Sequence, residues 1–164
     1  MTDEEFKSLI LPRQDMMYRV AFLILRKEED AADIVQDTML SLWQKRASLS
    51  SDGNIPAYCA AAARNKSLSH IRDTGNVVSI EDTTVEPAEE PSERFESKER
   101  LSAVESMLER LPENQKRVIR LFSYSGCSNE EIAEITGFSD VNVRALLSRG
   151  RRRLRELLSS SAKH

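Results

Sequence analysis

Apolar residues in the N-terminal part of the chain recur at the spacing of amphipathic helices. Residues 17–25 show the pattern most clearly, with apolar positions at i, i+3, i+4, i+7 and i+8: Met17, Val20, Ala21, Ile24 and Leu25. Similar stripes begin near residues 6–10 and run through residues 34–43, and a further helix is expected with Pro56 in its first turn. Short helices that must bury one side against each other predict a small helical bundle.

Residues 128–158 have the pattern of two helices separated by a tight turn. Ser128 can cap the first helix, with Glu131 three residues later in the capping-box arrangement. Gly137 permits a sharp turn, and Ser139 is placed to cap the second helix. The apolar positions of the second helix share one side: Val143, Leu146, Leu147 and Leu154. This arrangement predicts a helix-turn-helix.

The remaining surface of that second helix is dominated by arginine. Its polar positions are Asn142, Arg144, Ser148, Arg149, Arg151, Arg152 and Arg155. In a helix-turn-helix, the second helix lies in the major groove, where its early residues contact base edges and others hold phosphates. A helical hairpin with a solvated charged surface is the alternative. Arginines packed this densely without interleaved acids favour DNA binding.

Residues 74–96 differ in composition from the segments on either side. Asp, Glu, Pro, Thr and Ser dominate, and Pro87 and Pro91 would interrupt any regular element. We therefore expect an all-α protein of two small helical domains, residues 1–73 and 97–164, joined by a flexible acidic linker. The linker is interpreted as a self-repelling tether, with competition against DNA as the alternative.

The net charge of −3 conceals a strong asymmetry along the chain of 164 residues. Residues 73–113 carry twelve acidic and four basic residues, whereas residues 114–164 carry five and ten. The basic C-terminal part agrees with a nucleic-acid partner. Cys59 and Cys127 lie far apart, with no CxxC motif and no histidine cluster. We therefore expect no disulfide framework, no metal site and no cofactor.

The N-terminus has no signal-peptide pattern, because Asp3, Glu4 and Glu5 stand where a basic segment would be needed. No apolar run approaches the ~18 residues that span a bilayer. We expect a cytoplasmic protein without membrane insertion. A catalytic site is not expected either: Asp33 and Asp37 have no histidine or Gly-rich phosphate loop nearby, and His70 is isolated.

Two polar surfaces in the N-terminal domain have two possible interpretations each. Asp33, Gln36 and Asp37, at i, i+3 and i+4, form either solvated surface or a docking surface for another protein. The helix after Pro56 ends in basic and hydrogen-bonding residues that begin at Arg64. Beside a polar loop such a helix can hold an unstacked base, although basic surface helices are also common.

Three segments, in order, resemble the extracytoplasmic-function (group 4) sigma factors of the bacterial sigma-70 family. Residues 30–43 (DAADIVQDTMLSLW) resemble region 2.2, and residues 56–72 resemble regions 2.3 and 2.4. Residues 111–121 (LPENQKRVIRL), followed by the helix-turn-helix, resemble region 4. The resemblance covers nearly the whole chain except the linker and the extreme ends.

The resemblance implies a partner for each surface. Region 2.2 of the family binds the clamp coiled coil of the largest subunit of core RNA polymerase, here through Asp33, Gln36, Asp37 and Leu40. The following loop and helix melt and capture the −10 element, which assigns Leu49, Asn54, Arg64, Asn65, Lys66 and Arg72. Region 4 reads the −35 element, which assigns Ser128, Ser139, Asn142, Arg144, Ser148, Arg149, Arg151 and Arg152. The flap of the second-largest subunit and an anti-sigma factor are further implied partners.

Two positions depart from the family pattern within the helix-turn-helix. Relatives often carry arginine at the position of Leu146, so we expect one DNA contact to be missing. They usually carry alanine at the position of Gly150, and glycine in a helix interior costs about 1 kcal/mol. An ordinary helix-turn-helix regulator, or a sigma-like protein that binds polymerase without promoter specificity, remains as an alternative.

Overall fold

The computed structural model describes residues 1–75 and 98–162, and within these ranges every regular element is a helix, which confirms the expected all-α fold. In chain order the elements are α1 (Asp3–Leu9), η1 (Leu11–Arg13), α2 (Gln14–Leu25), α3 (Glu28–Gln44), η2 (Arg46–Ser48), α4 (Ile55–Thr74), α5 (Lys98–Glu109), α6 (Glu113–Ser123), α7 (Asn129–Thr136) and α8 (Asp140–Ala162). The expected linker lies, from residue 76 to residue 96, outside the described residues. We call residues 1–75 the N-terminal module and residues 98–162 the C-terminal module.

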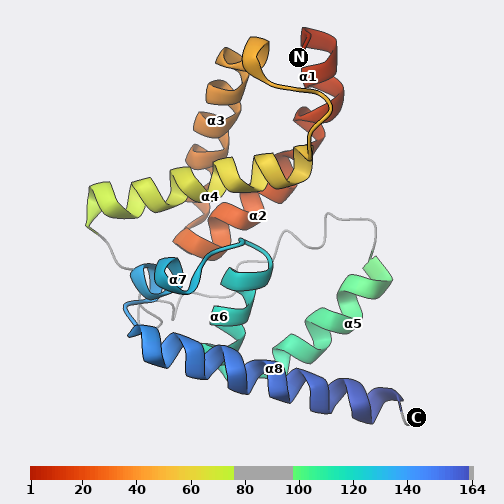
Figure 1. Cartoon of the computed structure of the whole chain (residues 1–164), viewed down its shortest axis with the longest axis vertical. Helices are drawn as coiled ribbons and strands as arrows, with labels where there is room; N and C mark the ends of the chain where they lie inside the picture. The colour runs from red at the N-terminus through yellow and green to blue at the C-terminus, as the bar shows by residue number, and fades with distance from the viewer. Residues whose placement is uncertain (76–97, 163–164) are drawn as a thin grey trace.

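Helix α2 forms the centre of the N-terminal module and packs along both α3 and α4 (Figure 1). Its C-terminal half is apolar nearly all round, so the residues from Val20 to Leu25 are all buried. The helix ends where Arg26 adopts a left-handed conformation, with φ of 60°. Helix α4, which follows α3 and η2, begins with a cap from Asn54 and has Pro56 in its first turn.

The elements η1 and η2 are short 3-10 helices that the apolar pattern does not predict. Each has three residues, which is too few to display a period. In η2, Arg46 stacks over Trp43, with 3.8 Å from the guanidinium carbon to the ring centroid, and forms an ion pair with Asp3 of α1. The same Trp43 is partly buried and meets Phe6 edge-on, with 5.0 Å between the ring centroids.

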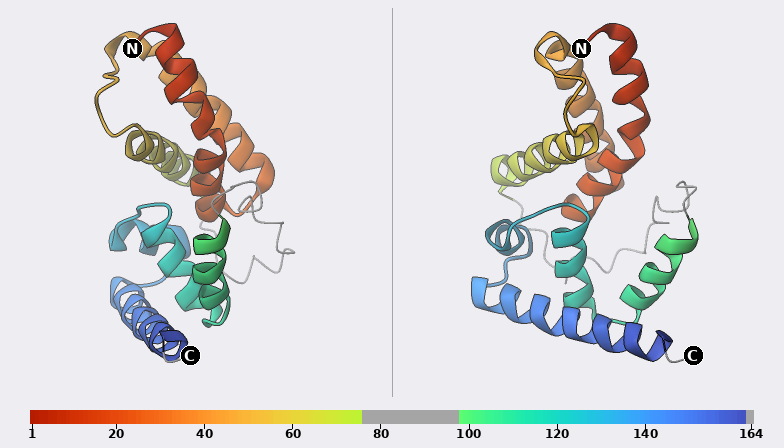
Figure 2. Two further views of the ribbon diagram at one scale, coloured as in Figure 1. Left: turned by 90° about the vertical axis from the view of Figure 1, so that its right-hand side faces the viewer. Right: turned by 45° about the vertical axis from the view of Figure 1, so that its right-hand side comes forward.

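The C-terminal module is built on α6 and α8, with α7 packed against both (Figure 2). Its core contains the buried side chains of Val118, Leu121, Ile132, Ile135 and Val143. In all views α8 lies at the end of the molecule away from α1 and α3 (Figures 1 and 2). One long side of α8 therefore remains uncovered by other described helices.

Leu146 and Gly150, the two residues of α8 that depart from the family pattern, both contribute to packing. Leu146 is only 7% exposed and belongs to the hydrophobic core, so it adds to the packing of α8. Gly150 lies where α8 crosses α6: a Cβ atom there would be 2.4 Å from Cδ1 of Ile119. The glycine permits the close approach of the two helices, and α8 continues through it without interruption.

The two modules pack against each other through polar contacts to the end of α2. Nη1 of Arg117 in α6 donates a hydrogen bond to the carbonyl oxygen of Leu23 at 2.8 Å, and the Ser125 hydroxyl donates to that of Val20 at 3.1 Å. Carbonyls at a helix C-terminus lack intrahelical partners and attract cations. Arg117 thus caps a helix of the other module. Burial, together with the charge of Arg26, lowers the pKa of Arg117 to about 9, so the side chain stays charged at neutral pH.

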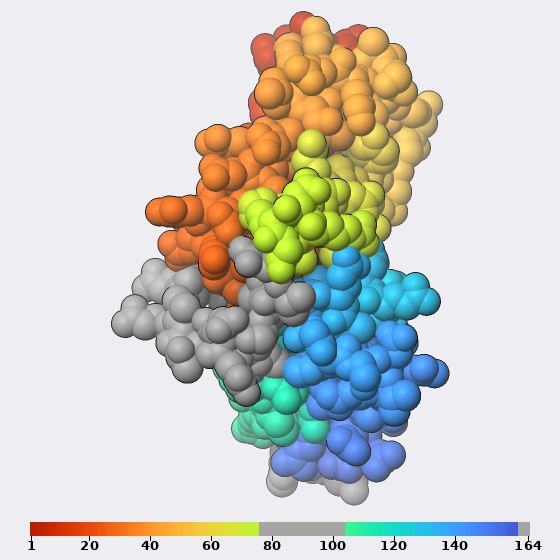
Figure 3. All heavy atoms as spheres, turned by 90° about the vertical axis from the view of Figure 1, so that its left-hand side faces the viewer, coloured from red at the N-terminus to blue at the C-terminus, as the bar shows by residue number. Residues whose placement is uncertain are grey.

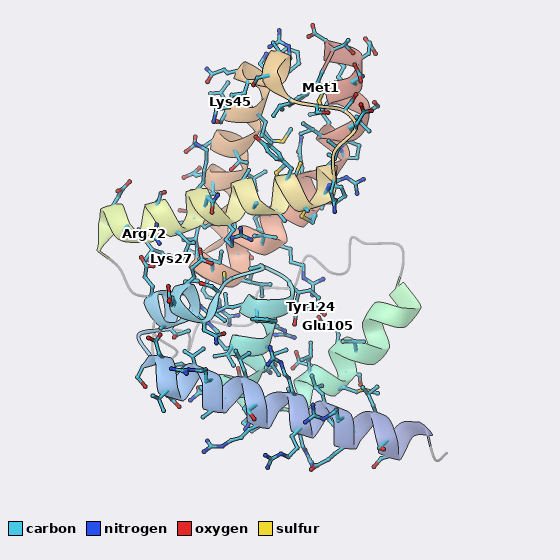
Figure 4. The ribbon with its side chains drawn as sticks, in the orientation of Figure 1. Met1, Lys27, Lys45, Arg72, Glu105 and Tyr124 are labelled. Carbon is cyan, nitrogen blue, oxygen red and sulfur yellow. The ribbon has the colours of Figure 1, made fainter. Side chains whose placement is uncertain are left out.

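An ion-pair network around Glu105 of α5 makes a second contact between the modules. Its carboxylate accepts hydrogen bonds from Arg19 of α2 at 2.7 Å, from Arg120 of α6 at 2.8 Å and from the Tyr124 hydroxyl at 2.9 Å. Arg19 also lies over the Tyr124 ring, 4.1 Å from its centroid. Figure 4 shows Glu105 and Tyr124 pointing toward each other from their separate elements. The network therefore connects three helices of two modules.

Candidate nucleic-acid interface

Helices α7 and α8 form the expected helix-turn-helix. The Ser128 hydroxyl accepts from the Glu131 amide at 3.1 Å, and the Glu131 carboxylate accepts from the Ser128 amide at 2.8 Å, which completes the capping box. Gly137 ends α7 with φ of 81°, a conformation that glycine adopts without strain. The Ser139 hydroxyl then accepts from the Asn142 amide at 3.1 Å and caps α8. Both serine hydroxyls act in this structure as helix caps.

The basic surface of α8 is open to solvent. Its exposed side chains include Asn142, Arg144, Ser148, Arg149, Arg151, Arg152 and Arg155. They extend over several turns, on the side away from the buried Val143 and Leu147. The arginines near the end of this surface have local partners: Arg151 lies over the Phe122 ring at 4.7 Å, and Arg153 is 3.4 Å from Glu156. The surface has the charge and the helical geometry of a major-groove reader.

A hollow of about 260 Å³ borders this surface between the start of α6 and α8. It is lined by Pro112, Gln115, Arg149, Arg152, Arg153 and Glu156. Three guanidinium groups at one hollow favour an anionic group such as a DNA phosphate. All three guanidinium groups come from α8, where Arg153 also pairs with Glu156, whereas Pro112 and Gln115 on the α6 side are uncharged.

Helix α3 exposes the polar surface noted in the sequence. Asp33, Gln36 and Asp37 are all exposed, and Leu40 on the next turn is 57% exposed. The opposite side of α3 is buried, including Thr38, whose hydroxyl donates to the Ile34 carbonyl at 2.6 Å. The four residues therefore form one exposed surface of α3, with a single apolar side chain beside polar ones.

The residues assigned to the −10 element do not all lie in one environment. The Asn54 side chain caps α4 by accepting from the Ala57 amide at 3.2 Å, and the Leu49 carbonyl accepts from the N-terminal ammonium of Met1 at 2.8 Å. Asn65 is exposed and Lys66 is half-buried. Asn54 is exposed as well, but its side-chain oxygen is engaged as the cap of α4.

Arg64 and Arg72, which lie on α4 beside these groups, contact the C-terminal module. Nη1 of Arg64 donates to the carbonyl oxygens of Gly126 at 3.2 Å and Ser125 at 3.4 Å. Arg72 donates to both carboxylate oxygens of Glu134 in α7, at 2.5 and 2.9 Å. The hydrogen bond and charge of Arg72 lower the pKa of Glu134, and those of Glu134 raise the pKa of Arg72. Figures 3 and 4 show the end of α4 directly against the helix-turn-helix.

Glu134 and Arg117 are contact residues that the sequence pattern does not single out. In the sequence, Arg117 is one of several basic residues of α6 and does not break its apolar pattern. In the structure, it is only 7% exposed. The clue to Arg117 is that α6 places three basic residues on the side that is buried in the structure: Lys116, Arg117 and Arg120. A buried charge requires a partner: Lys116 and Arg120 pair with glutamates of their own module, whereas Arg117 donates to carbonyl oxygens of the other module.

The described residues contain no cluster of His, Cys, Asp and Glu that could hold a metal ion. Cys59 and Cys127 are buried free thiols, and burial is the main cause that raises the pKa of each, to about 12 for Cys127. Such thiols are unreactive at neutral pH. Within the described ranges no helix is both long and apolar enough to cross a bilayer.

Comparison with known families covers both modules. Residues 9–77 match the family described as sigma-70 region 2, and residues 101–154 match sigma-70, region 4. The chain is 29% identical over 161 residues to the ECF RNA polymerase sigma factor SigE of Mycolicibacterium smegmatis, with 95% of the chain aligned. It is 28% identical over 153 residues to the ECF RNA polymerase sigma factor SigM of Mycobacterium tuberculosis.

The alignments differ in how much of each relative they span. The chain spans 61% of the length of that SigE and 76% of that SigM. Among solved structures, the sigma factor RpoE from Bartonella quintana, in complex with the anti-sigma factor NepR, is similar with a TM-score of 0.50 and 30% identity. That similarity covers 95% of this chain and 98% of the RpoE chain. With both regions matched in order, this chain belongs to the extracytoplasmic-function sigma factors of the sigma-70 family.

Proposed function

We propose that this chain is a dissociable specificity subunit that brings core RNA polymerase to promoters with particular −10 and −35 elements. The observation that carries the proposal is the combination, in one chain, of an open arginine-rich recognition helix and a separate module with an exposed polar docking helix. An ordinary helix-turn-helix regulator needs only the first. The proposed division of the chain is residues 1–73 for region 2, 74–96 for the linker and 97–164 for region 4.

The docking helix is α3. Asp33, Gln36, Asp37 and Leu40 are exposed together, and the proposed partner is the clamp coiled coil of the largest polymerase subunit. Carboxylates at the rim of an apolar contact give orientation and a fast, salt-dependent association. The flap of the second-largest subunit is the proposed partner of the C-terminal module. With two modules on one polymerase, each contact can be weak alone, because tethering supplies a high effective concentration for the second.

For the −10 element, Asn65 is the proposed reader of an unstacked base. Its amide has donors and an acceptor for the edge of a base, and it lies exposed on α4. Arg64, Lys66 and Arg72 lie near it in sequence and supply positive charge for phosphates. Because Arg64 and Arg72 contact the C-terminal module here, promoter binding would exchange these contacts for DNA.

For the −35 element, the proposed contacts are on α8. Asn142, Arg144, Ser148 and Arg149 would face base edges or adjacent phosphates, and Arg151 and Arg152 would hold the backbone. Ser128 and Ser139, which cap the starts of α7 and α8, are the remaining proposed contacts of this surface. The chain would act without catalysing a reaction of its own, while the polymerase performs the chemistry.

An anti-sigma factor is the proposed regulatory partner, since the similar RpoE from Bartonella quintana is solved with the anti-sigma factor NepR. An inhibitor that occupies α3 and the recognition helix together would prevent polymerase and promoter binding. The proposal places the protein in the cytoplasm, where its polymerase and DNA partners are found.

The decisive experiment reconstitutes the purified chain with bacterial core RNA polymerase and maps start sites by genome-wide run-off transcription. Specific start sites that share two spaced motifs would support the proposal and supply both promoter elements. Core binding without specific starts would favour a sigma-like interaction protein. A failure to bind core, with retained DNA binding, would point to an ordinary regulator.

A further inference from the structure

Val141 is an apolar side chain in an unusual place. It is 73% exposed, more than any other large apolar residue in the described part of the chain. It is the second residue of α8, directly after Asp140. A β-branched residue in an exposed helix position has lower helix propensity than alanine, and at this exposure it gains little from packing. Packing within the described residues therefore does not account for valine at this position.

The position of Val141 on the helix places it within the basic surface. Ala145 and Ser148 follow at i+4 and i+7, so they share its side of α8, and Arg144 at i+3 adjoins them. The buried Val143, two residues on, points to the other side. Between Val141 and Arg155 the sequence has no Asp or Glu. The surface around Val141 is therefore suited to a polyanion.

The start of α8 is better suited to base edges than to phosphates. Asp140 is exposed beside Val141, and a carboxylate is repelled by the sugar-phosphate backbone. In a helix-turn-helix, the first residues of the recognition helix are the ones that reach into the major groove. The apolar group that base edges present there is the C5-methyl group of thymine, which apolar side chains contact.

We propose that Val141 is a specificity-determining residue that contacts the C5-methyl group of a thymine in the −35 element. The inference rests on the proposed function, since it needs the recognition helix to lie in the groove of that element. The contact selects thymine over cytosine at one position, because cytosine lacks the methyl group. This apolar contact adds to the specificity given by the hydrogen bonds that the polar residues of α8 supply.

The test uses holoenzyme reconstituted with core polymerase on a promoter from which it initiates. Each thymine of the −35 element, on either strand, is replaced singly by deoxyuridine, which keeps the base pair and removes only the methyl group. For the wild-type chain, one such replacement should lower the affinity for promoter by about three- to fivefold, the loss expected for one buried methyl group. Val141→Ala should lower the affinity for the unmodified promoter by a similar factor and be insensitive to deoxyuridine at that same position.

Two control variants separate this inference from the proposed function. Val104→Ala changes an exposed valine of α5, 45% exposed and outside the recognition helix, and should behave as wild type. Arg144→Ala should weaken binding equally on thymine and deoxyuridine promoters. The role of Val141 would be overturned if Val141→Ala lost as much affinity as the wild-type chain at every deoxyuridine position. A −35 element without thymine would overturn it as well. If Arg144→Ala and Val141→Ala both left −35 dependence unchanged, the proposed function of α8 would fail as well.

Discussion

Arg72 and Glu134 are 62 residues apart in the sequence and form a two-point ion pair across the two modules, with Nε–Oε1 at 2.5 Å and Nη2–Oε2 at 2.9 Å. Parallel hydrogen bonds between a guanidinium and a carboxylate fix direction as well as distance. Arg72 belongs to α4, on which the −10 contacts are proposed, and Glu134 belongs to the helix-turn-helix. The pair therefore links the two proposed DNA-binding surfaces.

Breaking this ion pair should loosen the contact between the modules. Glu134→Gln removes the charge and keeps the shape, so Arg72 becomes free to pair with a phosphate. We expect an increased distance between fluorophores placed on the two modules and about two- to fivefold tighter binding of a single-stranded −10 oligonucleotide.

The matched control for that experiment is Glu130→Gln, which changes an exposed carboxylate on the same helix, α7. It should alter neither the distance nor the oligonucleotide affinity. Because the Arg72–Glu134 pair is exposed to solvent, 0.5 M salt should reduce the difference between wild type and Glu134→Gln. Identical distances in the two proteins at low salt would show that the other contacts alone hold the modules together.

The docking surface of α3 predicts a charge-reversal effect. Asp37 is exposed beside Leu40, so Asp37→Arg should weaken binding to core polymerase by tenfold or more, the effect of placing a like charge at a steered interface. Thermal unfolding should change little, since the side chain has no packing role. Fluorescence anisotropy with labelled protein measures the affinity.

Glu28→Arg provides the same charge change at the exposed first residue of α3, outside the surface formed by Asp33, Gln36, Asp37 and Leu40. This variant should bind core nearly as well as wild type, with a small loss of helix stability because acids favour the helix N-terminus. If both variants weakened binding equally, the effect would come from total charge and not from the surface of Asp37.

The close approach of α6 and α8 makes Gly150 and Ile119 energetically coupled. Gly150→Ala gains about 1 kcal/mol in helix propensity, but its Cβ would be 2.4 Å from Cδ1 of Ile119. We expect a net loss of about 1 kcal/mol in the free energy of unfolding, measured by urea titration.

Ile119→Val removes Cδ1 and should cost about 1 kcal/mol by itself. In that background, Gly150→Ala should raise stability, because the main clash is gone while the gain in propensity remains. Simple additivity of the two single changes would contradict a direct contact between these positions.

The Glu105 network predicts an acid-dependent part of the stability. Burial raises the pKa of Glu105, but the Arg120 charge, the hydrogen bonds from Tyr124 and Arg120 and the Arg19 charge together outweigh it and lower the pKa below the value of 4.5 that an unperturbed glutamate has. As the pH falls, the Glu105 carboxylate is therefore protonated at a higher pH in the unfolded chain than in the folded protein. The stabilisation is complete above about pH 4.5 and is lost as the pH falls through the folded-state pKa.

Glu105→Gln should thus lower the free energy of unfolding by about 2 kcal/mol at pH 7, the usual magnitude for charged hydrogen bonds. Urea titrations repeated at several pH values should show the difference in unfolding free energy between wild type and Glu105→Gln shrinking below about pH 4. Glu109→Gln, at a side chain that is 58% exposed, should show a smaller loss at pH 7. A difference for Glu105→Gln that stays constant down to pH 3 would contradict the lowered pKa.

Much of the local structure follows from residues that are close in sequence. The capping box of Ser128 and Glu131, the turn at Gly137 and the apolar side of α8 each involve partners within a few residues, and all were predictable from spacing. The exposed polar side of α3 follows in the same way from the 3.6-residue period. Fold class and the positions of the proposed surfaces therefore need no tertiary information.

The contacts between the modules depend instead on residues far apart in the chain. Arg117 reaches the Leu23 carbonyl from 94 residues away, and Arg72 reaches Glu134 from 62. Spacing rules carry no information about such pairs, because they depend on how finished helices pack. The same holds for Gly150, whose neighbour Ile119 on α6 decides that close packing requires a glycine there. Local periodicity and caps determine where helices form. Which helices pack together depends on surface shape and charge, which exist only once the helices have formed.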